Sequence, residues 1–256
     1  MFIFYDFETS DKDFLAQILS YSFIVVDERY QIINECNGTI KPNRLECPST
    51  GAILTNKLNI STLLKSGQSE YEAAKHIHSF LDTMIQTHGP MPLIGFNSAR
   101  FDFKHYEKLM LKYGLSPTFF GKLGSSDVLQ FTRYCALQKP TLFPFTKQNN
   151  NDTPYYSFKL EDCAKAFNCL HTPQTHDAKD DVLLTIELVK AMEQELSMTL
   201  ERFITHQKDT TAFETPNSVL TTHQFSFEQI EDTPVIDQNE WIVIGGVIVV
   251  LFCEWE

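Results

Sequence analysis

The chain has 256 residues, of which 43% are hydrophobic and 21% charged, as expected of a globular protein with one large domain or with one domain and an appendage. Its formal net charge of −12 argues against a protein that coats nucleic acid, because such proteins are usually basic. Six cysteines without a Cys-x-x-Cys pair exclude common zinc-site spacings and suggest a cytoplasmic protein, and the early acid Asp6 argues against a signal peptide.

The first part of the chain has the patterns of strands, and helical patterns follow. The predicted strands are residues 2–7, 20–26, 31–40 and 91–96, with a polar, turn-rich segment at 42–59. The predicted helices are residues 71–88, 103–113, 127–137, 159–167 and 180–200, with an exposed loop at 139–154. This order predicts a mixed sheet flanked by helices.

The C-terminal fifth differs in composition from the rest. We expect a domain at 1–205 and an acidic extension at 206–256, which holds one lysine and nine acids. The apolar run 241–252 is too short to cross a bilayer, so no membrane contact is expected. Its central Gly245 and Gly246 predict a β-hairpin, with an exposed edge for self-association as the alternative.

Two acids end the first predicted strand. Asp6 and Glu8 are one residue apart, so their side chains project from the same face of a strand. Neighbouring carboxylates repel each other and lose hydration when buried, unless a cation lies between them. Oxygen-only ligands suit Mg²⁺ or Mn²⁺. The pair therefore predicts half of a metal site, although acids at strand ends also occur in turns.

Three further residues complete a possible site. Asp102 follows the strand at 91–96 where a helix should begin, and His176 and Asp181 open the last long helix. Each acid alone could serve as a helix cap or complement a helix dipole. The combination of Asp-x-Glu, a distant Asp and His-x-Ala-x-x-Asp is far more specific than its parts.

With these five residues the chain resembles the DEDD superfamily of 3′→5′ exonucleases, in the subclass with a histidine base. It is most similar to the catalytic domain of the bacterial exonuclease I family, over about residues 1–205. The segments 4–9, 93–102 and 157–162 carry this closer resemblance. The resemblance implies an α/β, ribonuclease H-like fold, in which helices flank a five-stranded mixed sheet on both faces.

The resemblance also implies a metal-dependent enzyme that hydrolyses single-stranded DNA to nucleoside 5′-monophosphates with two Mg²⁺ ions, for which Mn²⁺ could substitute. Asp6, Glu8 and Asp181 would hold the metal near the attacking water, and Asp6 would bridge to the second metal. Asp102 would act mainly through the water shell of that second metal. His176 would be the general base, since its ordinary pKa lies near neutrality.

Contacts with the substrate are expected from residues close to these acids and from one lysine. The candidates are Glu8, Thr9, Phe96, Asn97, Arg100 and Lys159. Lys159 stands where the family has an arginine, so it keeps the charge without the bidentate fork. The segment 53–58 stands where the family has an Ile-Thr-Gly-Ile wedge, and it lacks the glycine.

Two other functions remain open at this stage. One is an RNA-trimming exonuclease, because nothing in the sequence reads the 2′-hydroxyl, although DNA is the preferred substrate. The other is a non-catalytic module that binds nucleic acid with the same fold. Since only about 50 residues follow the predicted domain, we expect a distributive enzyme.

Overall fold

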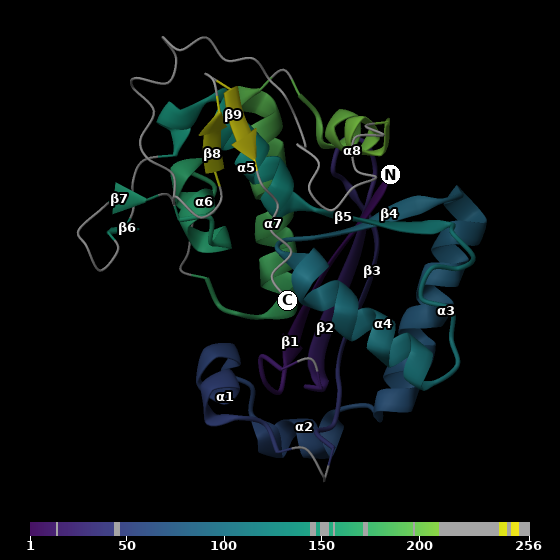
Figure 1. The fold of residues 1–256 in the computed structure, drawn as a ribbon. Coiled ribbons are helices and arrows are strands. Elements are labelled where there is room, and N and C mark those ends of the chain that lie inside the picture. The colour runs from purple at the N-terminus through teal and green to yellow at the C-terminus, as the bar shows by residue number, and fades with distance from the viewer. Residues whose placement is uncertain are drawn as a thin grey trace.

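The strand β1 (Phe2–Thr9) lies in the middle of a five-stranded sheet with the order β3-β2-β1-β4-β5 (Figure 1). This computed structural model describes residues 1–13, 15–43, 47–143, 147–148, 154–155, 157–170, 174–196, 198–209, 241–244 and 247–250. The other strands of the sheet are β2 (Ile18–Val26), β3 (Ile32–Thr39), β4 (Met91–Gly95) and β5 (Leu123–Asp127).

The first three strands form an antiparallel meander, and β4 and β5 then pair in parallel on the other side of β1. The predicted mixed sheet is therefore confirmed. Helices cover both faces, and their bounds are α1 (Thr50–Asn56), α2 (Ile60–Ser66), α3 (Glu70–His88), α4 (Asp102–Lys112), α5 (Val128–Gln138), α6 (Leu160–Ala166), α7 (Ala178–Glu195) and α8 (Leu200–Asp209).

Alternate residues of β1 contribute to two different cores. Phe2 and Phe4 pack with buried residues of α5, α6, α7 and α8. Ile3, Tyr5 and Phe7 pack with buried residues of α3 and α4 on the opposite face. Because side chains alternate along a strand, the acids at positions 6 and 8 belong to the face covered by α7. This arrangement brings the end of β1 and the start of α7 together.

Four predictions about the elements are wrong. The segment 42–59 is not all turn, because α1 lies within it and α2 follows directly. The strand β5 was missed, and residue Asp127 belongs to its end instead of starting a helix. The predicted helix 180–200 is two helices, since α7 ends at Glu195 and α8 begins at Leu200. The predicted loop at 139–154 contains a 3₁₀ turn (Pro140–Leu142) and the short strands β6 (Lys147–Gln148) and β7 (Pro154–Tyr155).

The C-terminal part of the chain is described only in two strands. β8 (Trp241–Ile244) and β9 (Val247–Val250) pair antiparallel, with Ile244 opposite Val247, as a hairpin requires. Residues 210–240 and the glycines 245–246 lie outside the described part. The predicted boundary after residue 205 falls inside α8, and the division into a domain and an extension stays a prediction.

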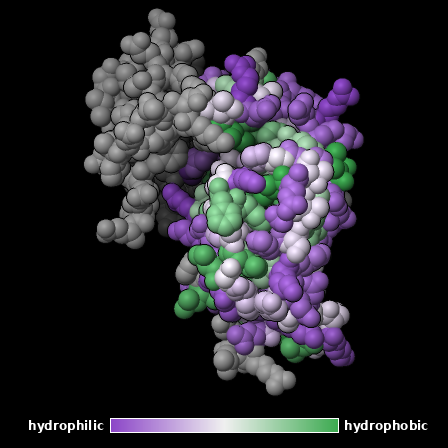
Figure 2. Space-filling view, turned by 90° about the vertical axis from the view of Figure 1, so that its right-hand side faces the viewer, coloured by the Kyte–Doolittle hydropathy of each residue, from purple (hydrophilic) through white to green (hydrophobic). Residues whose placement is uncertain are grey.

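The surface of the described part mixes hydrophobic and hydrophilic side chains (Figure 2). None of the helices in the described ranges is long and apolar enough to cross a membrane. On the face shown in Figure 2, hydrophobic side chains form patches with hydrophilic side chains between them. Large exposed hydrophobic residues, such as Leu111 and Phe120, are scattered along the sequence, as is common on globular proteins.

Candidate active site

Three of the predicted acids meet where the carboxyl end of β1 lies against the first turn of α7. Asp6 and Glu8 come from β1 and Asp181 from α7, and each offers one carboxylate oxygen within 4.8 Å of the others. Asp6 is half-buried, whereas Glu8 and Asp181 are only 8% and 7% exposed. We refer to Asp6, Glu8 and Asp181 as the carboxylate cluster.

Two other acids near the start of α7, Asp177 and Asp180, make contacts of their own outside the carboxylate cluster. Asp177 caps the helix, and its side chain accepts hydrogen bonds from the backbone N–H groups of Lys179 and Asp180. Asp180 is exposed and accepts a bond from the Thr175 hydroxyl at 2.8 Å. Of these three acids, Asp181 alone belongs to the carboxylate cluster.

The two oxygens of Asp181 have different surroundings. Its Oδ2 accepts a hydrogen bond from Gln174 Nε2 at 2.7 Å. Its Oδ1 is buried and has no hydrogen-bond partner within the part of the chain that the structure describes. A buried carboxylate oxygen without a partner is costly, and a divalent cation between the acids would satisfy it. The oxygen-only donor set therefore fits a hard metal ion.

The electrostatics of the carboxylate cluster agree with this fit. Burial raises the pKa of Asp6 well above its usual range, and the charges of Asp102, Asp181 and Glu8 raise it further. Burial, followed by the charge of Asp181, raises the pKa of Glu8 to about 8. Burial also raises the pKa of Asp181 to about 6, against the opposing effect of the Gln174 hydrogen bond. Without a cation, these acids resist ionising together at neutral pH.

Asp102 lies near the cluster without being one of its three members. It is the first residue of α4, 5% exposed, and the preceding Phe101 holds the cap position. Burial raises the pKa of Asp102, although backbone N–H groups of Asp102 and Phe7 oppose the effect by hydrogen bonding. Because its charge raises the pKa of both Asp6 and Glu8, Asp102 lies within electrostatic reach of the cluster.

A fourth buried acid, Asp127, was not among the predicted site residues. Its carboxylate accepts hydrogen bonds from the N–H groups of Asn97 at 2.7 Å, Ala99 at 3.1 Å and Leu129 at 2.9 Å. Asp127 thus caps α5 and also holds the turn that leads from β4 to Asp102. The capping position is visible in the sequence, but the tie to the turn depends on the parallel pairing of Gly95 with Asp127.

His176, the predicted base, lies in the segment before α7. It is half-buried and has left-handed backbone geometry, with a φ of 56°. Its positive form would lower the pKa of Asp181, which shows that the imidazole lies near the cluster. Gln174 and Asp177 on either side of it are both tied to α7.

The predicted substrate contacts fall into different settings. Thr9 is buried, and its hydroxyl donates to the Asp11 carbonyl at 2.6 Å. Phe96 is half-buried against the core on the α7 face, whereas Asn97 is exposed with a φ of 58°. Both residues lie in the turn after β4, where the N–H groups of Asn97 and Ala99 donate to Asp127.

The two predicted basic contacts are both exposed. Arg100 ends the 3₁₀ turn at Ser98–Arg100, directly before the segment that carries Asp102. Lys159 precedes α6 at the cap position and makes no capping bond with its side chain. Both side chains are therefore placed as surface cations, and their contact with a substrate stays a prediction.

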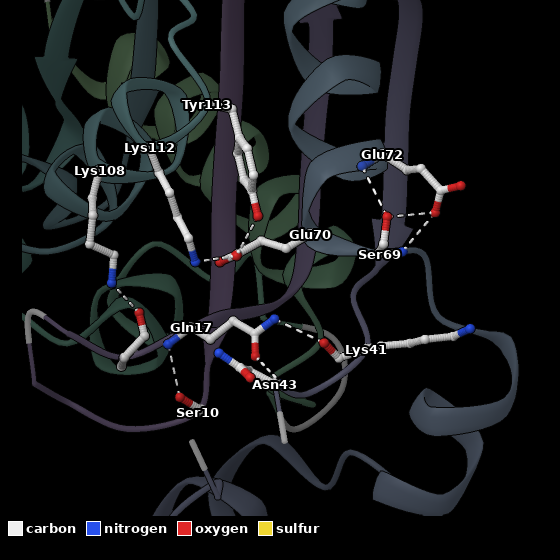
Figure 3. A network of polar contacts seen from close by, with 11 residues as sticks. Ser10, Gln17, Lys41, Asn43, Ser69, Glu70, Glu72, Lys108, Lys112 and Tyr113 are labelled. Atoms are coloured by element: carbon white, nitrogen blue, oxygen red, sulfur yellow. Dashed lines mark hydrogen bonds and ion pairs between the residues drawn. The ribbon is translucent and has the colours of Figure 1, made fainter. Parts of the chain in front are cut away.

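Several hydrogen bonds hold the loop that follows β1. Figure 3 shows buried Gln17, whose backbone N–H donates to Ser10 Oγ at 2.9 Å. Its side chain donates to the Lys41 carbonyl and accepts from the Asn43 N–H, at 2.9 and 2.7 Å. In addition, Lys108 of α4 donates to the Ala16 carbonyl. These contacts join α4 to the loop between β1 and β2.

Comparisons with known proteins show what the whole domain is similar to. No family model matches the chain. Over 204 residues it is 27% identical to exodeoxyribonuclease I of Buchnera aphidicola subsp. Acyrthosiphon pisum (strain APS), a match that covers 75% of this chain and 46% of the relative. Over 211 residues it is 26% identical to exodeoxyribonuclease I of Escherichia coli (strain K12), covering 80% of this chain and 42% of the relative.

Solved structures show the same likeness. E. coli exonuclease I in complex with a dT13 oligonucleotide is 26% identical, with a TM-score of 0.66 over 80% of this chain and 44% of that protein. The zinc-bound form of the E. coli complex with single-stranded DNA has a TM-score of 0.70, at 24% identity, over 84% of this chain and 45% of that protein. The chain spans less than half the length of these relatives. In sequence and fold the chain is thus similar to the exodeoxyribonuclease I proteins, and it has the expected ribonuclease H-like arrangement of a five-stranded mixed sheet with helices on both faces.

Proposed function

We propose that this chain is a metal-dependent 3′→5′ exonuclease that hydrolyses single-stranded DNA to nucleoside 5′-monophosphates. The carboxylate cluster carries the proposal, because three acids with raised pKa values lie together, and one oxygen of Asp181 is buried without a hydrogen-bond partner among the described residues. Such a cluster is costly for stability alone and useful for phosphodiester chemistry. Asp102 and His176 nearby supply the other groups that this chemistry needs.

The proposed ion is Mg²⁺, with Mn²⁺ as a substitute, because each donor in the cluster is a carboxylate oxygen. Asp6, Glu8 and Asp181 would hold it, and Asp6 and Asp102 would serve a second ion. When bound, the cations supply positive charge beside the scissile phosphate and acidify the attacking water.

The protein's own groups then have separate tasks. A ring nitrogen of His176 takes the proton of the attacking water. Asp127 keeps Asp102 in place by holding the turn before it. Thr9, Phe96 and Asn97 would line the pocket for the terminal nucleotide. Arg100 and Lys159 would be surface cations for the phosphate backbone.

Single-stranded DNA is the proposed substrate because the relatives are exodeoxyribonucleases and one solved relative holds a dT13 oligonucleotide. The complete set of acids argues against a module that only binds nucleic acid. The five described cysteines are all free thiols, which suits the reducing cytoplasm, where we place the protein.

The test uses 5′-labelled single-stranded DNA and RNA of equal sequence, with Mg²⁺, Mn²⁺ or a chelator. The expected product is a ladder that shortens from the 3′ end of DNA and disappears with chelator. Asp181→Asn should abolish it, whereas Asp180→Asn, a change in the adjacent exposed acid, should preserve it. If the protein cleaves only RNA, the proposed DNA substrate is wrong. If it cleaves neither polymer, the proposed activity is wrong.

A further inference from the structure

Gln174 contacts the one acid of the carboxylate cluster that comes from a helix. Its side-chain nitrogen donates to Asp181 Oδ2 at 2.7 Å, across seven positions of the chain. Asp181 is 7% exposed and Gln174 is half-buried, so this bond is partly buried. This bond goes to Oδ2, and the other oxygen, Oδ1, has no hydrogen-bond partner among the described residues.

We propose that Gln174 is a positioning residue that orients Asp181 for metal binding, an inference that rests on the proposed function. The hydrogen bond to Oδ2 fixes the rotation of the carboxylate and leaves Oδ1 to the cation. Metal ligands are commonly oriented by an outer hydrogen bond of this kind, and its loss typically weakens metal binding by about 10–100-fold.

The same contact also ties down the segment that carries His176. Gln174 lies two residues before His176, and Asp181 lies five residues after it. The left-handed backbone of His176, with a φ of 56°, is an uncommon geometry for this residue type and needs support from both sides. Asp177 provides that support on one side by capping α7, and Gln174 provides it on the other.

A neighbouring contact offers a matched control. The Thr175 hydroxyl donates to Asp180 Oδ2 at 2.8 Å, so it joins the same segment to the same turn of α7. Asp180 is exposed and does not belong to the carboxylate cluster. The same hydroxyl accepts a bond from the Asp177 N–H at 3.3 Å. Removing the hydroxyl therefore releases contacts between this segment and α7 without touching a proposed metal ligand.

The experiment measures Mn²⁺ binding to the full chain without substrate, from the electron paramagnetic resonance signal of free Mn²⁺. Gln174→Met, which removes the amide and keeps the length, should weaken binding by about 10–100-fold. Thr175→Val should bind Mn²⁺ as the wild type does. Far-UV circular dichroism checks that both variants fold, and Gln174→Asn, whose amide is one methylene too short, serves if Gln174→Met does not.

The outcomes separate this inference from the proposed function. Wild-type affinity in both Gln174 variants would overturn the positioning role, and so would equal weakening in Thr175→Val. A wild-type chain that binds no Mn²⁺ would overturn the metal-dependent activity itself, whatever the variants do.

Discussion

Replacing Glu8 by glutamine should change how the stability of the metal-free protein depends on pH. Burial and the charge of Asp181 raise the pKa of Glu8 from its ordinary 4.5 to about 8. The folded protein therefore binds a proton at Glu8 more tightly than the unfolded chain does. This stabilisation is complete below about pH 4.5 and is lost as the pH rises through about 8.

The size of the effect follows from the two pKa values. Each pH unit between 4.5 and about 8 contributes at most about 1.4 kcal/mol, which sets a ceiling of about 5 kcal/mol. It is a ceiling because any water that enters the site screens the new charge. Glutamine has a similar shape and does not titrate, so Glu8→Gln should lack this loss of stability.

The assay is urea unfolding of chelator-treated wild type and Glu8→Gln at a series of pH values from about 4.5 to 9. The free energy of unfolding of the wild type, relative to the variant, should fall steadily across this range. Adding Mg²⁺ at the alkaline end should restore the wild type more than the variant. Parallel pH profiles for the two proteins would refute the reasoning, because Glu8 would then titrate as it does in water.

Three further variants test how the fold supports the site. Asp127→Asn replaces one of the two accepting oxygens by an NH2 group, so at least one of the three backbone donors loses its acceptor, and the variant should lose about 1–3 kcal/mol of stability in urea unfolding and have a lower kcat. Equal activity with wild type would exclude a role in placing Asp102. In Gly95→Ala the new Cβ would lie 2.4 Å from Ser98 Cβ, so activity should fall, and adding Ser98→Gly should restore it. If adding Ser98→Gly does not restore activity, the loss in Gly95→Ala is not caused by its contact with Ser98. Tyr30→Phe removes a 2.7 Å bond to Glu193 and should cost about 1 kcal/mol in urea unfolding without changing activity. An unchanged unfolding midpoint would show that this bond contributes nothing.

Much of the site's geometry could be predicted because it depends on local rules. The two-residue period of a strand places Asp6 and Glu8 on one face, and the structure has them there, beside Asp181. The neighbouring acids Asp177 and Asp180 have other contacts, because Asp177 caps α7 and Asp180 accepts a hydrogen bond from Thr175 at the surface. The roles of the five predicted residues in catalysis stay predictions.

Two of the elements that the sequence does not predict, α1 and β5, lack the regular spacing of apolar residues by which helices and strands are recognised. α1 buries no residue, so it has no apolar stripe, and its start depends on the capping side chain of Ser49. β5 reads Leu-Gly-Ser-Ser-Asp and lies at the sheet edge, where small polar residues are tolerated. These elements are set by caps and pairing more than by their own composition.

Other missed features depend on contacts between distant parts of the chain. Nothing between α7 and α8 is a glycine or proline, yet the helix stops at Glu195. Glu193 accepts a hydrogen bond from the Leu200 N–H at 2.6 Å, which helps to begin the next helix. The hold of Asp127 on the turn before Asp102 likewise needs the sheet to form first. These contacts form only in the folded protein, so they leave no pattern in the local sequence.

The most direct test of the account is a crystal structure of the full chain with Mn²⁺ and thymidine 5′-monophosphate, using the anomalous signal of manganese. We expect a manganese peak coordinated by Asp6, Glu8 and Asp181, with the phosphate of the nucleotide beside it. Gln174 should still contact Asp181 Oδ2 in that structure. A carboxylate cluster without metal, or a nucleotide bound elsewhere on the chain, would contradict it.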